Sequence, residues 1–264
     1  MQQVKAKKHL GQHFLKDPEI ARSIADSLAI HTGYKKVLEI GPGMGILTRF
    51  LLANNRYETW VSEIDPESIQ FIRRNIPELD GRILEGDFLQ LNLPEIMKEP
   101  FAIIGNFPYN ISSQILFRVL DNRELVPEVT GMFQKEVAER IASGPGNKEY
   151  GILSVFLQAY YQVELLFYLD ESAFEPAPKV KSAVLHFTRK ENFKLGCNEK
   201  KFRAVVKAGF NQRRKTLSNA LASLAGKERS RTLPYASLRA EALTWEQFVE
   251  LTNLLETDTK PIEQ

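Results

Sequence analysis

The sequence predicts an α/β protein in which a mostly parallel sheet is followed by a small all-helical domain. Over roughly the first two thirds of the 264-residue chain, short apolar runs alternate with amphipathic stretches, which is the pattern of βαβ units. Two strand-like runs that follow each other closely before residue 190 indicate an antiparallel edge on that sheet. Beyond residue 190 the apolar residues recur with helical spacing throughout.

Five strand-like runs come first along the chain, and segments with helical patterns lie between them. The runs are KKVLEI (35–40), TWVSEI (59–64), GRILEG (81–86), FAIIGN (101–106) and EVTGMFQ (128–134); two of the helical segments are GILTRFLLANN (45–55) and SSQILFRVLDN (112–122). Parallel strands need a crossover connection, which is usually a helix. This order therefore predicts strands that run mostly in one direction.

The chain changes character after Gly144-Pro145-Gly146. A helical segment (150–160) leads into two strands, VELLFYL (163–169) and SAVLHFT (182–188), which we expect to form the antiparallel edge. A linker around residues 190–192 is followed by four helical segments: KKFRAVVKAGF, RRKTLSNALASL, YASLRA and TWEQFVELTNLLE. We therefore predict a catalytic domain at 1–189 and a helical domain at 190–264.

The composition is that of an ordinary globular protein, with 43% hydrophobic and 26% charged residues. A single cysteine, Cys197, excludes an internal disulfide framework and fits a reducing compartment. The N-terminus lacks the apolar core of a signal peptide, and polar residues interrupt the longest apolar stretch. We expect a cytoplasmic monomer that contacts no membrane. Without metal-ligand spacing among the histidines, we also expect no metal: they are His9, His13, His31 and His186.

The net charge of +2 is unevenly distributed along the chain. Residues 1–187 hold 20 Lys and Arg against 24 Asp and Glu, whereas residues 188–264 hold 15 against 9. Such asymmetry hints that the basic segment contacts a nucleic acid. A solvated helical surface explains the same distribution equally well.

The stretch VLEIGPGMGILT places Gly41, Gly43 and Gly45 directly after the first predicted strand and before a helix. Glycine there lets the backbone approach a ligand closely and adopt a positive φ. The spacing differs from the GxGxxG of dinucleotide binders, and no phosphate-loop lysine follows. The preceding Glu39 suits a cationic sulfonium better than a pyrophosphate. The alternative is a generic tight turn.

Acidic residues follow the next two predicted strands. The second predicted strand ends SEID, which contains Glu63, and a carboxylate at that position accepts hydrogen bonds from both ribose hydroxyls. The third predicted strand ends EGDF, which places Asp87 at the same predicted edge, where it is suited to accept from an adenine amine. Glu63 alone is equally well explained as a surface acid. Together with the glycines, they favour an adenosyl ligand.

The fourth predicted strand ends in Asn106, Phe107, Pro108 and Tyr109. Asn and Pro are ordinary turn residues, so a simple turn is one interpretation. The other is a clamp for a planar aromatic amine. The Asn106 side-chain oxygen and the Pro108 carbonyl would each accept one N–H, which positions the nitrogen for attack on a methylsulfonium. Tyr109 would stack on the base.

Over roughly residues 5–220 the chain resembles the ribosomal RNA adenine N6,N6-dimethyltransferase family. The segments that carry the resemblance are, in order, GQHFLKD, VLEIGPGMG, SEID, EGDF, GNFPYNISS, FQKEVAERI, GILSVFLQ, SAFEPAPKVKSAV and GFNQRRKTLSNAL. The resemblance implies a Rossmann-like, seven-stranded S-adenosylmethionine-dependent methyltransferase fold with a small C-terminal helical domain. It also implies the activity of that family. This is dimethylation of two adjacent adenosines near the 3′ end of 16S rRNA, in assembling small ribosomal subunits, with S-adenosyl-L-methionine as cofactor.

Residue by residue, the resemblance assigns a cofactor pocket and a substrate contact. The cofactor pocket would be lined by His13, Leu15, Gly41, Gly43, Glu63, Asp87 and Asn106. Many family members have Asn where this chain has His13. The resemblance casts Phe174 as an aromatic on the other face of the target base; a hydrophobic plug is the alternative. Asn106, Pro108, Tyr109 and Phe174 form the predicted catalytic set.

Three consecutive cations, Arg213, Arg214 and Lys215, stand at the start of a helical pattern and are predicted to bind RNA. A helix would fan them over about 200°, so that one contacts the catalytic domain and the others reach phosphates. A basic turn with interdomain ion pairs is the alternative. Two rival functions stay open: a 23S rRNA adenine methyltransferase of the antibiotic-resistance type, and a ribosome-assembly factor with vestigial chemistry.

Overall fold

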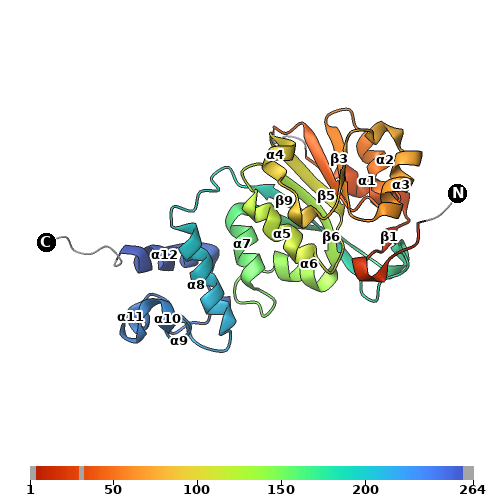
Figure 1. The fold of residues 1–264 in the computed structure, drawn as a ribbon. Helices are drawn as coiled ribbons and strands as arrows, with labels where there is room; N and C mark the ends of the chain where they lie inside the picture. Colours follow the sequence, from red (N-terminus) through yellow and green to blue (C-terminus); the bar gives the residue numbers. More distant parts are fainter. Residues whose placement is uncertain (1–3, 30–32, 258–264) are drawn as a thin grey trace. The chain divides into compact units, whose positions relative to one another are not determined.

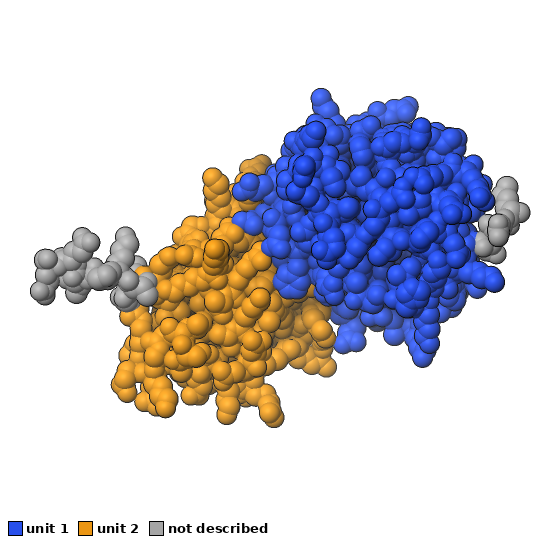
Figure 2. All heavy atoms as spheres, viewed as in Figure 1, with its two compact units in different colours: residues 1–138, 163–189 blue, residues 139–162, 190–264 orange. Residues whose placement is uncertain are grey.

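The computed structural model of the chain describes residues 4–29 and 33–257 (Figure 1). The chain divides into two compact units, shown in different colours in Figure 2. Unit 1 comprises Met1–Ala138 and Val163–Arg189, and unit 2 comprises Glu139–Gln162 and Lys190–Gln264.

A seven-stranded sheet with the order β4-β3-β2-β5-β6-β9-β7 forms the centre of unit 1 in the described part of the chain. Strands β2 to β6 pair in parallel, and β9 pairs with β6 in the antiparallel direction. The α/β class, the seven strands and the antiparallel edge are therefore confirmed. The strands are β2 (Lys36–Ile40), β3 (Glu58–Glu63), β4 (Ile83–Glu85), β5 (Phe101–Asn106), β6 (Glu128–Gln134), β7 (Tyr161–Leu169) and β9 (Ser182–Arg189).

Helices fill the connections between the parallel strands (Figure 1). Two of them begin with the same local signal. Asp17 and Asp65 cap the first turn with a side-chain oxygen, and a proline follows each of them. The helices are α1 (Pro18–Asp26), α2 (Ile46–Leu52), α3 (Pro66–Asn75), α4 (Leu93–Met97), α5 (Ser112–Asp121) and α6 (Lys135–Ala142), with 3₁₀ turns η1 (Lys8–Leu10), η2 (Pro77–Leu79), η3 (Phe88–Gln90) and η4 (Glu171–Ala173).

One hydrophobic core joins α1 and α2 to a face of the sheet. Successive side chains of a strand point to opposite faces, so every second residue of the central strands enters this core. The buried members from helices and strands include Ala21, Ile24, Leu47, Leu51, Val37, Ala102, Ile104 and Met132. This packing positions β2 and β5, at whose ends Glu39 and Asn106 lie.

A second, two-stranded sheet was not predicted. Strand β1 (Phe14–Leu15) pairs antiparallel with β8 (Phe174–Glu175). Each strand has only two residues, which is too short to give a period-2 pattern. The pairing joins the N-terminal segment to the loop before β9.

Unit 2 is helical, and its longer helices, α7 (Ile152–Tyr160), α8 (Glu199–Asn211) and α12 (Trp245–Thr257), pack against one another. Because α7 packs on α8 and α12, residues 139–162 group with this unit and not with the sheet. This grouping differs from the predicted boundary at residue 190 in that one segment; the domain assignment stays a prediction. The remaining elements are α9 (Leu217–Ala220), α10 (Ala222–Ala225), α11 (Lys227–Thr232) and η5 (Ala240–Ala242).

Two helical expectations in this unit were wrong. The segment YASLRA forms turns, and Tyr235 there has a φ of 62°. Arg213, Arg214 and Lys215 lie in the turn between α8 and α9 and not on a helix. Among the described residues, no helix is both long and apolar enough to cross a membrane.

Candidate functional site

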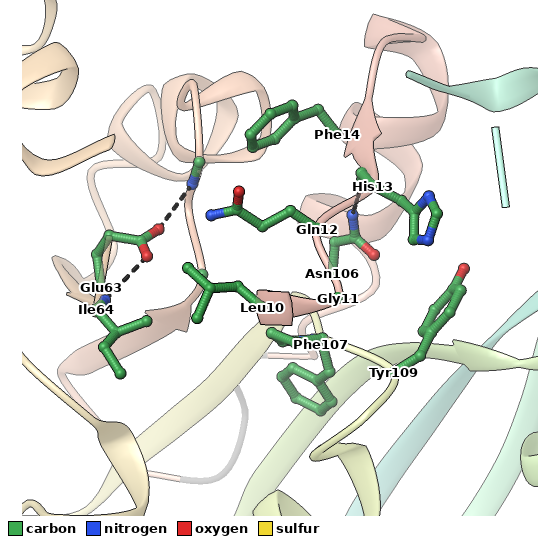
Figure 3. Close-up of a pocket in the computed structure, with 13 residues that line it drawn as sticks. Leu10, Gly11, Gln12, His13, Phe14, Glu63, Ile64, Asn106, Phe107 and Tyr109 are labelled. Carbon is green, nitrogen blue, oxygen red and sulfur yellow. Dashed lines mark hydrogen bonds between the residues drawn. The ribbon is translucent and has the colours of Figure 1, made fainter. Parts of the chain in front are cut away.

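Three adjoining hollows lie at the carboxyl ends of β2, β3 and β5, and Gly41 lines all of them. The hollow between Asn106 and Glu63 has a volume of about 50 Å³ (Figure 3). The hollow toward Leu15 measures about 30 Å³, and the one toward Asp87 about 150 Å³. Ligands of open α/β sheets bind at this edge, outside the carboxyl ends of the strands.

The glycine turn after β2 forms the floor of the site. Gly41, Gly43 and Gly45 have φ angles of 68°, 56° and 76°, which disfavour residues with a Cβ. A Cβ on Gly43 would lie 2.8 Å from the ring of Phe14, so glycine is also needed for space. Because these residues have no side chains, the backbone of Gly41 and Gly43 lines the cavity directly.

Glu63 ends β3 and is buried, with 5% of the residue exposed. Its Oε1 accepts from the amides of Ile64 and Asp65 at 2.9 Å, and its Oε2 accepts from the amide of Gly43 at 3.3 Å (Figure 3). Burial raises the pKa of Glu63. The three backbone hydrogen bonds lower it, but the effect of burial is larger. Since Oε1 already has two donors, Oε2 is the oxygen with acceptor capacity left for a ligand hydroxyl.

Asp87 lines the neighbouring hollow with Glu63. Its Oδ1 accepts from the Leu89 amide at 2.9 Å, which leaves Oδ2 for a ligand amine. The sequence predictions missed two apolar residues, Leu10 and Ile64, which line both this hollow and the one beside Asn106. Ile64 is 47% exposed in the structure. The signal available in the sequence was an apolar residue directly after the acid at the end of a strand.

Glu39 lies at the end of β2 and lines the hollow toward Leu15. It is 2% exposed, and its Oε2 accepts from the Thr48 hydroxyl at 2.6 Å. Burial raises the pKa of Glu39 to about 8, and the nearby Glu63 carboxylate adds to the shift. A cationic ligand in this hollow would stabilise the ionised carboxylate, as expected for a sulfonium.

Phe107 anchors the Asn106–Tyr109 segment in the core. Its ring is 1% exposed and packs edge-on against Phe133 at a centroid distance of 5.3 Å. Gly131 leaves the space for it, because a Cβ there would lie 2.3 Å from the Phe107 ring. With Phe107 held in the core, its neighbours Asn106, Pro108 and Tyr109 line the cavity.

The Asn106 side chain is oriented by a hydrogen bond. Its Nδ2 donates to the backbone carbonyl of His13 at 2.7 Å, so its Oδ1 remains an acceptor in the cavity (Figure 3). The Pro108 carbonyl accepts the Ile111 amide at 3.1 Å and keeps one lone pair. Of the two acceptors in the predicted clamp, Asn106 Oδ1 is therefore available to an amine, and the Pro108 carbonyl oxygen is available with one of its two lone pairs.

Tyr109 and His13 form a stacked pair, with ring centroids 5.6 Å apart and an angle of 27° between the planes. The Tyr109 hydroxyl lies 2.5 Å from the Ser182 Oγ, and burial raises the pKa of Tyr109. The His13 Nδ1 lies 2.7 Å from the Pro176 carbonyl oxygen. One face of Tyr109 is therefore covered by His13, and a base could stack on this ring only from the other face.

The segment before His13 is held over the cavity by Asp65. The Lys7 ammonium contacts Asp65 Oδ1 at 2.5 Å, and the Gln12 amide donates to Oδ2 at 3.2 Å. Burial alone would raise the pKa of Asp65, but these two donors lower it below its usual value. Gln12 also lines the cavity, and the sequence analysis did not predict this. Its position depends on Asp65, which is distant in the sequence.

Phe174 is not part of the cavity lining. It is 1% exposed and lies in the hydrophobic core with Leu15, Met132 and Leu169. Strand β8 places it opposite Leu15 in the two-stranded sheet. The structure therefore gives Phe174 the position of a hydrophobic plug, and stacking on a target base would require it to leave this core. Leu15 itself lines the hollow beside Glu39.

The predicted RNA-binding cations have different environments within unit 2. The Arg213 guanidinium donates to Glu241 Oε2 at 2.8 Å and to the carbonyl oxygens of Lys148 and Tyr150. It is therefore engaged in structural contacts. Arg214 and Lys215 are exposed in the turn that follows α8.

Among residues 4–29 and 33–257, no group of three His, Cys, Asp or Glu side chains could hold a metal ion. His31 lies outside the described residues. His186 is buried and contacts Thr130, and Cys197 is partly buried with its pKa raised to about 11 by burial.

Comparisons with known proteins agree with this geometry. The profile of the family described as ribosomal RNA adenine dimethylase matches residues 3–257. Ribosomal RNA small subunit methyltransferase A of Cytophaga hutchinsonii is 56% identical over 255 residues, which cover 97% of this chain and 99% of that protein. The crystal structure of a dimethyladenosine transferase from Plasmodium falciparum is similar with a TM-score of 0.79 and 25% identity, over 93% of this chain and 98% of that one. The 23S rRNA methyltransferase ErmE is similar with a TM-score of 0.68 and 26% identity, over 91% and 99% of the two chains.

Proposed function

The chain belongs to the ribosomal RNA adenine dimethylase family, and from this membership and the site we infer that it dimethylates two adjacent adenosines of 16S rRNA near its 3′ end. S-adenosyl-L-methionine is the proposed methyl donor, and the assembling small ribosomal subunit is the proposed substrate. Because small subunits assemble in the cytoplasm, we expect the enzyme to act there.

The residues present fit an adenosyl sulfonium cofactor. Asp87 Oδ2 and Glu63 Oε2 offer acceptors for an adenine amine and a ribose hydroxyl, while Leu10 and Ile64 offer apolar surface to the base. Glu39 supplies a buried carboxyl near the expected cationic end. When bound, the cofactor supplies an electrophilic methyl group on its sulfonium.

The observation that carries the proposal is the orientation of Asn106. Its Nδ2 is fixed on the His13 carbonyl, so its Oδ1 faces the space that Pro108 and Tyr109 also line. An aromatic amine is a weak nucleophile because its lone pair is delocalised into the ring. Accepting an N–H at Oδ1 holds the nitrogen in place and favours its pyramidalisation as attack begins.

Transfer of labelled methyl groups to isolated ribosomal subunits tests the function. We expect labelling of small subunits that lack the modification, at two adenosines, and no labelling of large subunits. Labelling of the large subunit would identify a 23S rRNA methyltransferase, the function named for ErmE. Tight binding to small subunits without any labelling would identify an assembly factor with vestigial chemistry.

Asn106→Ala tests the site within that assay. Removing a positioned acceptor in a transition state typically lowers the rate by about 10²–10³-fold. We expect a loss of this size at saturating cofactor, with cofactor affinity only modestly weakened. Asn55→Ala, at an exposed asparagine outside the site, is the matched control. A rate for Asn106→Ala within about fivefold of wild type would remove Asn106 from the catalytic role.

A further inference from the structure

Asp65 is a buried acid that follows the acidic end of β3. Its side chain is fully buried and caps α3, where Oδ1 accepts the Glu67 amide at 3.1 Å and Oδ2 accepts the Ser68 hydroxyl at 3.3 Å. Its backbone amide donates to Oε1 of Glu63 at 2.9 Å. The carboxylate is therefore fixed at the strand end that also presents Glu63 to the cavity.

The same carboxylate holds two side chains of the N-terminal segment. The Lys7 ammonium lies 2.5 Å from Oδ1, and the Gln12 side-chain amide donates to Oδ2 at 3.2 Å. The oxygen of that amide, Oε1, accepts the backbone N–H of Lys7 at 2.8 Å. Lys7 and Gln12 are thus joined to each other and to Asp65, so residues 7–12 form a loop whose two ends meet at this carboxylate.

The residue after this loop orients the side chain of Asn106. The His13 carbonyl oxygen accepts Nδ2 of Asn106 at 2.7 Å. Because a carbonyl oxygen only accepts hydrogen bonds, this contact decides that Oδ1 is the end of the Asn106 amide left for the amine. The pairing of β1 with β8 holds the chain after His13, and the Asp65 contacts hold the chain before it. In Figure 3 the Gln12 side chain extends from the side of His13 and Asn106 toward Glu63.

We propose that Asp65 is a positioning residue for methyl transfer: through the N-terminal segment it aims Oδ1 of Asn106 at the target amine. The inference rests on the proposed function. Asp65 and Lys7 lie outside the lining of the three hollows that the described residues form, so we expect both to act through other residues. A displacement of about 1 Å at the reacting groups can lower a rate by about 10²-fold, so a loosened segment is enough to impair the clamp.

Two variants loosen the segment and leave the lining of the cavity intact. Asp65→Asn offers one acceptor oxygen in place of two, so the first turn of α3 and Gln12 compete for it. Lys7→Met removes the ammonium and keeps a long side chain. Glu67→Gln is the matched control, because Glu67 is the other, exposed partner of Lys7 at 3.1 Å and its replacement leaves the Asp65 contacts in place.

The first measurement needs neither RNA nor cofactor. In ¹⁵N-labelled protein, the side-chain amide protons of Asn106 exchange slowly with water as long as Nδ2 donates to the His13 carbonyl. We expect this exchange to be at least about tenfold faster in Asp65→Asn and Lys7→Met, and unchanged in Glu67→Gln. Equal exchange rates in wild type and in the first two variants would overturn the inference.

The second measurement is the single-turnover methylation rate at saturating cofactor and small subunits, at a temperature where all variants are folded. We expect a loss of about 10- to 100-fold in Asp65→Asn and a smaller loss in Lys7→Met. In an Asn106→Ala background the same substitutions should change the rate by less than about twofold, because the group that they position is gone.

Two kinetic results would overturn the inference. One is a full additional loss in the Asn106→Ala background, which would mean that Asp65 acts on another group. The other is a loss confined to subunit affinity in Lys7→Met, which would make Lys7 an RNA contact. If the wild type labels no RNA at all, the proposed function fails, and the exchange measurement still decides whether Asp65 orients Asn106.

Discussion

The buried carboxyl of Glu39 makes the stability of the protein depend on pH. Its folded-state pKa of about 8 lies above the ordinary value of 4.5. Between these values the folded state holds a proton that the unfolded state has lost, so stability falls as pH rises through this window and levels off above it. One proton corresponds to at most about 1.4 kcal/mol per pH unit.

Glu39→Gln should remove this dependence. We expect the free energy of unfolding without cofactor to fall more steeply from about pH 5 to pH 8 in wild type than in the variant. Urea unfolding at several pH values measures both curves, and the variant serves as the control for all other titrating groups. Parallel curves would mean that Glu39 is ionised in the folded protein at neutral pH.

Phe174 offers a second prediction for a single side chain. Because its ring is fully buried with Leu15 and Met132, Phe174→Ala should lower the free energy of unfolding by about 3–5 kcal/mol. Urea unfolding measures the loss, and Phe174→Leu should recover much of it. If Phe174→Ala instead kept wild-type stability and lost only the use of RNA, Phe174 would be the base-stacking aromatic of the sequence prediction.

The strand end Asn106–Tyr109 shows how elements place catalytic groups. Phe107 enters the core over Gly131 of β6, so the geometry of the clamp depends on a glycine in the neighbouring strand. This dependence could not be read from the sequence, since Gly131 lies in an apolar run with no motif around it.

Gly131→Ala should therefore displace Phe107 and impair catalysis. A Cβ would lie 2.3 Å from the Phe107 ring and 2.9 Å from Phe133. Overpacking of this kind typically costs about 1–3 kcal/mol of stability. We expect a lower melting temperature and a methylation rate reduced by more than tenfold at a temperature where the variant is folded. Gly144→Ala, where a Cβ meets nothing within 4 Å, is the control. An unchanged rate in the folded variant would show that the clamp tolerates movement of Phe107.

At the scale of the whole molecule, the basic C-terminal part of the chain is the part that we expect to contact RNA. The basic turn after α8 contains one cation that is hydrogen-bonded within unit 2, Arg213, and two more exposed cations, Arg214 and Lys215. We propose that the exposed pair contacts RNA phosphates. Replacing both with Ala should weaken subunit binding at low salt.

The double variant should also flatten the salt dependence of subunit binding. The slope on logarithmic axes should fall by about 0.7–0.9 for each phosphate that the variant no longer neutralises. Binding measured at several salt concentrations tests this, and cofactor affinity should not change. Arg213→Ala is the contrasting variant, since we expect it to lower the melting temperature. Identical slopes for wild type and the double variant would assign Arg214 and Lys215 to a solvated surface.

The sequence by itself determined the features that depend on short-range pattern. The strands of the seven-stranded sheet, the glycine turn and the polar residues at the ends of β2, β3, β4 and β5 were predicted, because the carboxyl ends of parallel strands share one edge. Tertiary structure decided the features that depend on distant partners. It placed Phe174 in the core through the pairing of β1 with β8, and it engaged Arg213 with Glu241 and with Lys148. It also turned the His13 ring onto Tyr109, since Pro176, the group that holds the ring, lies 163 positions away in the chain. Periodicity and spacing report the local backbone, whereas the direction of a side chain is set by the neighbours that folding brings to it.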